Sequence, residues 1–511
     1  MDPAALQRLL QEAEQHIQSG RLPTAWNMLE RGRRKAPSEP AIISLMVAIQ
    51  ISNKQPAQAE RMANQLVQQQ PQSAQAQLTF GDALEAMGKG EEAVTAWQKA
   101  ASLDSQLAAP HTRLAHYWEA KKIYMEAESA AEKALQADSR DVQATLIRAR
   151  CDGIKNQPDQ AVKRLLKLPF DALKPDQRVT YYFELAKQQT GSRRYQQAFD
   201  AYIEANRLQN LQAPGDSPGR LATTEIPQLV ELAQQLPSLW PQAAAVAHAL
   251  PMTPGLQPPI FCIGFPRAGH SLLARMLAAH PRLMVMTDHT IHQSLKRAVG
   301  AKTTLELIKG VNPQQLLTLR AHYLKEQQRL TGERPPSISL VDVHSANLVE
   351  LPLLLLLFPN AQFIQLQRHP LDLALQLFIR RSEASDPATF RVGTFKEAAS
   401  LYVAQMNLHT QLSQLQPMKR VVVKYESMIE NMPNAMQHLL KGLGLPWNDA
   451  IRQYRTMPVR RLFSPYTIDA QVEMLHGQEL NLWQGFSGSF RGLLPALDPY
   501  VRHEGYPPVS R

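Results

Sequence analysis

Apolar and small residues in the N-terminal half recur with a period of 34 residues. Positions at this spacing carry alanine, and a proline or serine stands where one unit passes into the next. The alanines are Ala25, Ala59, Ala93, Ala127 and Ala161, and the turn residues are Pro37, Pro71, Ser105 and Ser139. Between these points the apolar residues have the spacing of amphipathic helices. The pattern predicts pairs of helices, each pair packed closely at its alanine.

A period of 34 residues is typical of the tetratricopeptide repeat, a two-helix unit that stacks into a superhelix. Gly20 and Gly88 stand at two of the expected turns, and a sixth unit near residues 181–206 carries Ala198 at the matching place. We therefore expect an all-α superhelix of five to six repeats over residues 1–206. The concave face of such an array can bind extended peptides, so we expect a protein or peptide partner there.

Residues 207–258 have a different composition, with frequent prolines and one short helix expected around residues 229–236. The prolines are Pro214, Pro218, Pro227, Pro237, Pro241, Pro251, Pro254 and Pro258. Because proline interrupts regular structure, this stretch is predicted to be a linker. Proline also stiffens a chain, so we expect limited rather than free movement.

Residues 259–511 alternate short apolar runs with helical patterns. The runs at 260–264 and 363–367 are expected to be buried strands, each followed by a helix. Such alternation predicts an α/β domain with a central parallel sheet and helices on both faces. The apolar run at 348–358 contains Glu350 and is too short to span a bilayer, so it is expected to be a core helix.

Charge and cysteine content limit the partners and the compartment. The chain has 511 residues with 55 basic and 45 acidic side chains, a formal charge of +10, and this excess favours anionic partners. Basic residues are not interleaved with aromatics, so nucleic-acid binding is not expected. Cys151 and Cys262 are the only cysteines, and they imply no disulfide framework. Without a signal peptide or a transmembrane segment, the protein is expected to be cytoplasmic.

A glycine-containing turn between an expected strand and an expected helix is the first sign of chemistry. Residues 261–271 read FCIGFPRAGHS, with Gly264 and Gly269 at the spacing of a phosphate-binding loop and Ser271 in its hydroxyl position. His270 stands where nucleotide triphosphatases have lysine. Arg267 is the one fixed positive charge of the loop. Such a P-loop-like turn gathers backbone amides around a phosphate group.

A second segment repeats this arrangement of strand, basic residue and helix. Residues 361–380 read AQFIQLQRHPLDLALQLFIR, with Arg368 at the end of the strand and Pro370 in the first turn of the helix. Gln376 and Arg380 lie four residues apart and are expected to share one helix face.

Together the two segments resemble the donor-binding motifs of the sulfotransferases that use 3′-phosphoadenosine 5′-phosphosulfate. The chain is similar to bacterial sulfotransferases linked to tetratricopeptide repeats and to tyrosylprotein sulfotransferases. The resemblance covers about the second half of the chain and continues at 280–281, 358–361, 424–427, 444–447 and 471–472, and at Trp483, Gly505 and Tyr506.

The resemblance implies two separate anion-binding sites for this co-substrate and no metal ion. Residues of the first segment would hold the 5′-phosphosulfate through backbone amides, the Ser271 hydroxyl and the charge of Arg267. These residues are Arg267, Gly269, His270, Ser271 and Leu272. Arg368, Gln376 and Arg380 match the contacts to the 3′-phosphate, with Arg381 as the alternative to Arg380. Tyr425 matches a tyrosine close to the donor.

The resemblance also places the catalytic base. The family has a glutamate eight residues after a histidine like His280, which corresponds to Asp288 in this sequence. A carboxylate there could take the proton of the acceptor hydroxyl. His289 is adjacent and, because imidazole titrates near neutrality, it is the competing base. Arg267 is the third candidate catalytic residue.

Several positions depart from the family pattern. Ala268 replaces a serine, His270 a threonine, Val343 a lysine and Gln376 a serine, and Glu473 stands where arginine is common. The loss of one preorganised charge commonly lowers a rate on the order of a hundredfold. His270 and His344 could supply replacement positive charge.

Three functions therefore remain open. The first is a sulfotransferase whose repeat array captures the acceptor, such as a protein tyrosine. The second is a non-enzymatic adaptor with a degenerate sulfotransferase-like domain. The third is a kinase or nucleotide triphosphatase with Asp342 as its magnesium carboxylate, which the missing lysine at position 270 disfavours.

Overall fold

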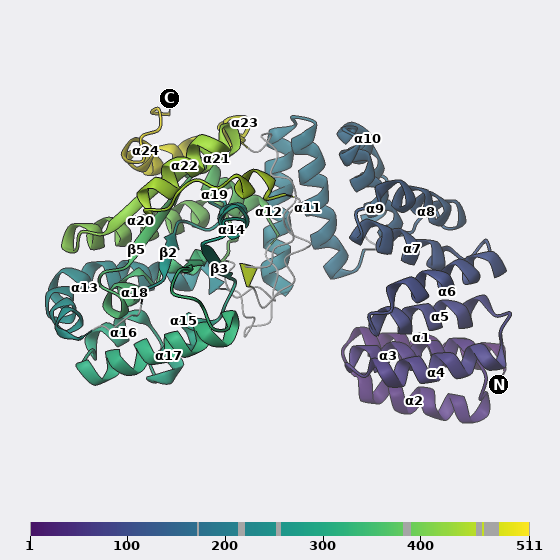
Figure 1. Cartoon of the computed structure of the whole chain (residues 1–511). Helices are drawn as coiled ribbons and strands as arrows, with labels where there is room; N and C mark the ends of the chain where they lie inside the picture. Colours follow the sequence, from purple (N-terminus) through teal and green to yellow (C-terminus); the bar gives the residue numbers. More distant parts are fainter. Residues whose placement is uncertain are drawn as a thin grey trace. The chain divides into compact units, whose positions relative to one another are not determined.

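The structure is a computed structural model that describes residues 2–170, 173–212, 220–251, 257–381, 390–455, 462–463 and 480–509 (Figure 1). The chain divides into two compact units, Met1–Arg194 and Tyr195–Arg511. Each unit is treated separately below.

The first unit is an array of helix pairs. Its helices are α1 (Pro3–Gln18), α2 (Leu22–Lys35), α3 (Pro40–Ser52), α4 (Pro56–Gln69), α5 (Ala74–Ala86), α6 (Gly90–Leu103), α7 (Ala108–Ala120), α8 (Tyr124–Ala137), α9 (Val142–Ile154), α10 (Pro158–Leu165) and α11 (Pro175–Gly191). The second helix of successive pairs begins every 34 residues, from Leu22 in α2 to Pro158 in α10. The predicted repeat array is therefore confirmed.

The periodic alanines lie where the paired helices meet. Each of the five has no exposed surface: Ala25, Ala59, Ala93, Ala127 and Ala161. A side chain this small lets two helix backbones approach closely. The turn between the two helices also recurs, with a residue of positive φ at Gly20, Lys54, Gly88, Lys122 and Asn156. Since only two of these are glycines, the sequence signal revealed only part of the turn pattern.

The second unit is built on a six-stranded parallel sheet. Its strands, in spatial order, are β7 (Lys419–Lys424), β5 (Gln362–Gln367), β2 (Ile260–Ile263), β4 (Ser339–Val343), β3 (Leu283–Thr287) and β8 (Leu462–Phe463). Every neighbouring pair is parallel. A separate two-stranded sheet pairs β1 (Arg220–Leu221) with β6 (Phe390–Arg391). The central parallel sheet expected from the sequence is confirmed.

Helices cover both sides of strands β5, β2 and β3 (Figure 1). The helices of the unit are α12 (Tyr195–Gln212), α13 (Ala222–Ala249), α14 (His270–Ala278), α15 (Ile291–Ala298), α16 (Thr304–Lys309), α17 (Pro313–Thr331), α18 (Leu351–Leu357), α19 (Pro370–Ile379), α20 (Phe395–Leu415), α21 (Tyr425–Glu430), α22 (Met432–Gly442), α23 (Trp483–Phe486) and α24 (Leu494–His503). Every residue of α18 is buried, so the apolar run of the sequence is a core helix.

The stretch expected to be a linker with one short helix contains the 28-residue helix α13. Three prolines lie inside this helix: Pro227, Pro237 and Pro241. The helix buries Leu229, Leu232, Leu236 and Trp240, and it packs along α20 and against α16 and α18. Burial of an apolar face outweighs the backbone hydrogen bonds that proline removes. The prolines in 213–219 and 252–256 lie outside the described residues.

Helix α12, expected to complete the sixth repeat, packs within the second unit. Its Phe199 and Tyr202 contact aromatic rings of later segments, and together these residues form the α12 aromatic cluster: Phe199, Tyr202, Phe378, Phe395, Phe486 and Phe490. The side-chain amide of Asn206 donates a hydrogen bond to the Phe378 carbonyl (2.8 Å), near the end of α19. This packing explains why the boundary between the units falls before α12.

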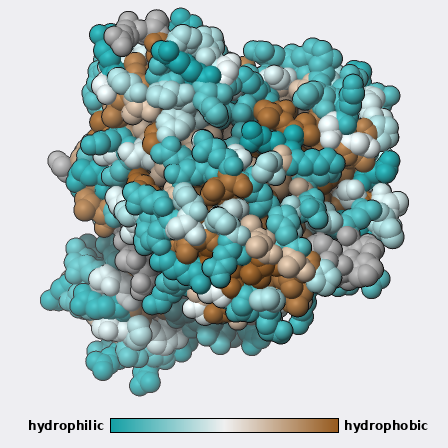
Figure 2. All heavy atoms as spheres, turned by 90° about the vertical axis from the view of Figure 1, so that its left-hand side faces the viewer, coloured by the Kyte–Doolittle hydropathy of each residue, from teal (hydrophilic) through white to brown (hydrophobic). Residues whose placement is uncertain are grey.

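Hydrophilic side chains predominate on the face shown in Figure 2, and hydrophobic ones form separate small patches there. Among the described helices, none has the length and apolar character needed to cross a membrane. Cys151 and Cys262 are buried free thiols.

Candidate active site

The candidate residues follow the carboxyl ends of neighbouring strands. The loop at 264–269 follows β2, Asp288 follows β3, Arg368 follows β5 and Tyr425 follows β7. Since all these strands are parallel, the residues lie at one edge of the sheet. Strands β4 and β3 lie on one side of β2, and β5 and β7 lie on the other. Ligands of open α/β sheets bind at such a switch point.

Close packing around the loop requires both of its glycines. A Cβ atom on Gly264 would lie 2.7 Å from the Leu366 carbonyl oxygen, and one on Gly269 would lie 2.5 Å from the Tyr425 ring. Gly269 has a φ of 108° and Arg267 a φ of 73°, so two loop residues take a left-handed conformation. Helix α14 begins directly after Gly269, and the amides of its first turn have no acceptor within the helix. These amides can donate to an anion, which is the role that the sequence predicts for the loop.

His270 is the first residue of α14 and stands where a phosphate-binding loop would have lysine. Burial lowers the pKa of its imidazole to about 4. Its Nε2 atom is shielded from solvent and has no hydrogen-bond partner among the described residues. This pKa shift disfavours a positive charge on His270, and the idea that His270 replaces a loop lysine stays a prediction. Ser271 is exposed and Leu272 is buried at the start of α14.

Arg368 connects the two motifs. Its guanidinium is buried, donates a hydrogen bond to the Arg267 carbonyl (3.3 Å) and lies 4.3 Å from the centre of the Tyr425 ring. Tyr425 is fully buried, and its ring fills the space that a side chain at Gly269 would need. The residues predicted to bind opposite ends of the donor are thus in contact.

Gln376 and Arg380 were expected to share a helix face, but α19 ends at Ile379 and Arg380 follows it with an extended backbone. The Arg380 guanidinium donates to the Gln376 side-chain oxygen (3.4 Å). Gln376 is buried, Arg380 is half-buried at the end of the helix, and Arg381 is exposed.

Asp288 and His289 are adjacent in sequence but occupy different environments. Asp288 is exposed, has a φ of 51°, and accepts a hydrogen bond from the Thr287 hydroxyl (2.9 Å). His289 is buried, and its Nδ1 accepts from the Ile291 amide (3.3 Å). Its Nε2 donates to an Asp342 oxygen (2.9 Å). Since both nitrogens of His289 are engaged, the geometry favours Asp288 as the accessible base.

Asp342 belongs to a buried hydrogen-bonded network. The Tyr323 hydroxyl donates to it (2.6 Å), and so does the Asn347 amide (3.2 Å). Burial alone would raise the pKa of Asp342, but the neighbouring His289 lowers it below its usual range. Its oxygens are occupied by protein donors, which argues against a magnesium ligand. Within the described ranges no group of His, Cys, Asp and Glu is arranged to hold a metal ion.

Two carboxylates that the sequence analysis did not assign hold the C-terminal segment against this site. Asp372 accepts from the amides of Asn481 (2.9 Å) and Trp483 (3.0 Å). Glu426 accepts from the His369 amide and the Tyr506 hydroxyl, both at 2.9 Å. The sequence did carry a signal for Asp372, because it and Gln376 are the only polar residues of α19.

The Trp483 ring stacks on His369 at a centroid distance of 4.9 Å. Trp483 and Tyr506, two positions of the family resemblance, therefore lie beside the strand end that carries Arg368. Residues 471–473, which include two further positions of the resemblance and Glu473, lie outside the described residues.

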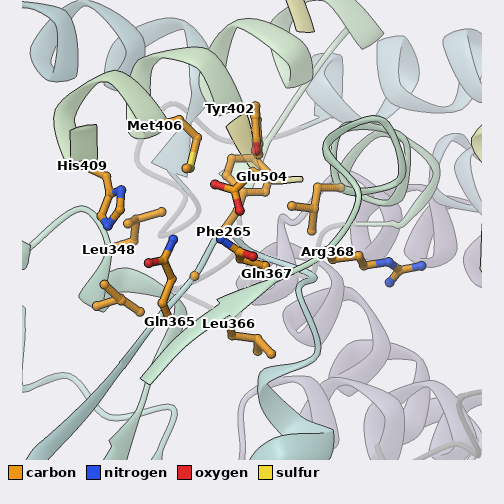
Figure 3. Close-up of a pocket in the computed structure, with 13 residues that line it drawn as sticks. Phe265, Leu348, Gln365, Leu366, Gln367, Arg368, Tyr402, Met406, His409 and Glu504 are labelled. Atoms are coloured by element: carbon orange, nitrogen blue, oxygen red, sulfur yellow. The ribbon is translucent and has the colours of Figure 1, made fainter. Parts of the chain in front are cut away.

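A cavity behind the loop is too small for a nucleotide. It has a volume of about 20 Å³ and is lined by residues that include Gln365, Tyr402, His409 and Glu504, which is room for about one water molecule. In Figure 3 the Arg368 guanidinium points away from these side chains. Gly264 and Arg368 also line the cavity, so it adjoins the anion-binding edge from the interior side.

Comparison with known proteins agrees with this geometry. Residues 258–449 match the model of the sulfotransferase family. An uncharacterised protein of Aquifex aeolicus strain VF5 is 26% identical over 214 residues, and a protein-tyrosine sulfotransferase of Drosophila melanogaster is 23% identical over 209 residues. Each match covers 38% of this chain, which spans 26% and 39% of the lengths of these two relatives. The resemblance read from the two motifs is confirmed.

The chain is also similar to solved structures of other proteins. A thermophilic TPR protein of Thermus thermophilus has 19% identity and a TM-score of 0.31, with coverage of 35% of this chain and 98% of that chain. PilF of Pseudomonas aeruginosa has 16% identity and a TM-score of 0.33, with coverage of 40% and 90%.

Proposed function

We propose that the sulfotransferase-family domain of residues 258–449 transfers a sulfuryl group from 3′-phosphoadenosine 5′-phosphosulfate to a hydroxyl group of a protein or peptide. One observation carries the proposal. A glycine loop, two arginines and an exposed carboxylate meet at the edge of the sheet where α/β proteins bind ligands.

The residues present fit the two ends of this donor. Gly264 and Gly269 let the loop pack against the Leu366 carbonyl and the Tyr425 ring, and the 5′-phosphosulfate would lie against the amides that begin α14. Ser271 and Arg267 would add a hydroxyl and a guanidinium. Arg368, Gln376 and Arg380 would hold the 3′-phosphate, because charge-assisted hydrogen bonds from arginine suit phosphate oxygens.

Asp288 would act as the base. The acceptor oxygen attacks sulfur while its proton passes to the Asp288 carboxylate. The bond between sulfur and the bridging phosphate oxygen breaks, and its electron pair remains on adenosine 3′,5′-bisphosphate. Arg267 would stabilise the negative charge that develops on the leaving phosphate. No metal ion is required for these steps.

The helix-pair array would bring the acceptor to the domain. Stacked two-helix repeats offer a concave surface that suits an extended peptide. A protein tyrosine is the acceptor that we favour, since the Drosophila relative is named a protein-tyrosine sulfotransferase. The free thiols of Cys151 and Cys262 fit a reducing compartment, and a cytoplasmic location stays a prediction.

The alternative is a nucleotide-binding adaptor without catalysis. Two departures from the family pattern favour it: burial lowers the pKa of His270 to about 4, and Val343 is a buried apolar residue where the family has lysine. The sulfotransferase and the adaptor would both bind the donor at this site, but only the sulfotransferase would transfer sulfate.

Calorimetric titration followed by a transfer assay tests the proposal. Adenosine 3′,5′-bisphosphate should bind without magnesium, and ATP with magnesium should bind more weakly. Sulfate transfer should then be detected by mass spectrometry in a panel of peptides, glycans and phenols. Binding without transfer to any acceptor would favour the adaptor. Preference for magnesium ATP would overturn both readings.

A further inference from the structure

Arg368, expected to bind the 3′-phosphate, is in direct contact with the loop that is expected to bind the 5′-phosphate. We infer that Arg368, besides binding the 3′-phosphate, positions the glycine loop, so that the two ends of the donor bind cooperatively. The inference rests on the proposed function for the identity of the ligand. The contacts that support the inference join protein residues and are present without any ligand.

The first contact acts on a strained residue. Arg267 has a φ of 73°, a left-handed conformation that is strained for a residue with a side chain. Such a backbone persists when its surroundings hold it. The hydrogen bond from the Arg368 guanidinium to the Arg267 carbonyl (3.3 Å) holds this peptide group from the neighbouring strand.

The second contact acts through Tyr425. One face of its ring lies 4.3 Å from the Arg368 guanidinium, at the distance of a cation–π contact. The same ring packs so closely on Gly269 that a Cβ atom there would be 2.5 Å away. Arg368 and Tyr425 thus support the loop at two residues, on either side of Ala268.

The consequence is a coupling between the two ends of the ligand. A 3′-phosphate that binds Arg368 fixes the guanidinium, and this in turn fixes the loop that receives the 5′-phosphate. Coupling between two sites is reciprocal, so a 5′-phosphate should also favour the 3′-phosphate. A ligand that lacks the 3′-phosphate should still depend on Arg368, because the loop does.

Arg380 provides the matched control. It is also expected to bind the 3′-phosphate, but it follows the end of α19 and donates a hydrogen bond to the Gln376 side chain of that helix. Lysine at either position keeps the positive charge but loses the planar guanidinium. Arg368→Lys and Arg380→Lys therefore differ in the support of the loop.

The experiment measures the affinity for two nucleotides by calorimetry. Arg368→Lys should weaken adenosine 5′-phosphate about tenfold, and Arg380→Lys should weaken adenosine 3′,5′-bisphosphate alone. The coupling is wrong if Arg368→Lys binds adenosine 5′-phosphate as well as the wild type does.

Hydrogen exchange without ligand tests the positioning role independently. Amides of residues 264–270 should exchange faster in Arg368→Lys than in Arg380→Lys, with β2 unchanged as the control for folding. If Arg368→Lys does not fold, Tyr425→Leu removes the same support and should show the same exchange. Equal loop exchange in all variants would overturn the inference. If the wild type binds neither nucleotide, the proposed function fails, and the exchange result still decides the role of Arg368.

Discussion

Two buried carboxylates of the second unit differ in how they are paired. Asp372 accepts two backbone hydrogen bonds, whereas one carboxylate oxygen of Glu504 has no partner among the described residues. Burial raises the pKa of Asp372 to about 6 and that of Glu504 to about 7. An ionised carboxylate without compensation costs stability, so Glu504 should weaken the fold at alkaline pH.

Replacing Glu504 by glutamine should therefore stabilise the protein in a pH-dependent way. The pKa of Glu504 rises from 4.5 to about 7 because burial outweighs the attraction of Lys424 and Arg420. The folded state thus favours the protonated form, and its cost grows as pH rises from about 4.5 through about 7. Glu504→Gln should gain on the order of 1–3 kcal/mol at pH 8.5 and little at pH 4.5. Thermal unfolding at both pH values measures this, and an equal gain at both would contradict it.

Substitutions of Asp288 test the proposed base. Asp288→Asn should abolish transfer while donor affinity stays intact, since the side chain keeps its size but loses its basicity. Asp288→Glu should retain or increase transfer, because it restores the reach of the family's glutamate. The assay is initial rate beside calorimetry of adenosine 3′,5′-bisphosphate. Loss of activity in His289→Ala, with Asp288→Asn still active, would reassign the base.

Sequence patterns located most of the candidate side chains but not their surroundings. The strand–loop–helix signals at 261–271 and 361–380 placed Arg267 in the loop after β2 and Arg368 at the end of β5, as the structure has them. The lowered pKa of His270 could not be predicted from the sequence, because it depends on burial by segments that are distant along the chain. The sequence marked Asp372 as a polar residue of an apolar helix but could not identify its donors, which are more than a hundred residues away in sequence.

The repeated turn of the first unit gives a prediction at the level of secondary-structure elements. Lys122 and Gly88 occupy equivalent turn positions with φ values of 61° and 78°. Lys122→Gly should raise stability by roughly 0.5–1 kcal/mol, because glycine adopts positive φ without steric cost. Gly88→Ala should lower it by a similar amount, and no atom within 4 Å would clash with the new methyl group. Chemical denaturation measures both, and equal signs would contradict the conformational explanation.

Substitutions on the buried and the exposed faces of α12 can show which face stabilises the second unit. Phe199 is buried in the α12 aromatic cluster, whereas Ile203 on the same helix is 40% exposed. Phe199→Ala should cost about 3–5 kcal/mol, and Ile203→Ala about 0.5 kcal/mol or less. Faster hydrogen exchange in α19 for Phe199→Ala alone would support this assignment. Similar exchange in both variants would show that α12 does not stabilise α19.

Helices that repeat a local pattern could be predicted from the sequence, whereas helices held by long-range packing could not. The 34-residue period predicted helix pairs because every unit repeats the same local pattern. Helix α13 was expected to be mostly linker, because prolines are a local signal while its burial against α20 is a long-range one. The place of α12 in the second unit was equally hidden, since its aromatic partners lie far along the chain.

The division of the molecule into two units predicts where the chain can be cut. A chain that begins at Tyr195 keeps α12 and should fold, whereas one that begins at residue 213 exposes the remaining aromatic cluster and should aggregate or bind hydrophobic dyes. Circular dichroism and dye fluorescence compare the two. Equal stability of both chains would mean that α12 is dispensable for the second unit.

The packing of α12 also restricts how this protein can evolve. Duplication or deletion of a whole 34-residue unit before α11 preserves the register of the array, because each repeat contacts mainly its neighbours. A duplication that replaced α12 would separate Phe199 and Asn206 from the helix that carries Gln376. Homologues are therefore expected to vary in repeat number upstream of α11 and to keep α12 in every lineage that keeps the second unit.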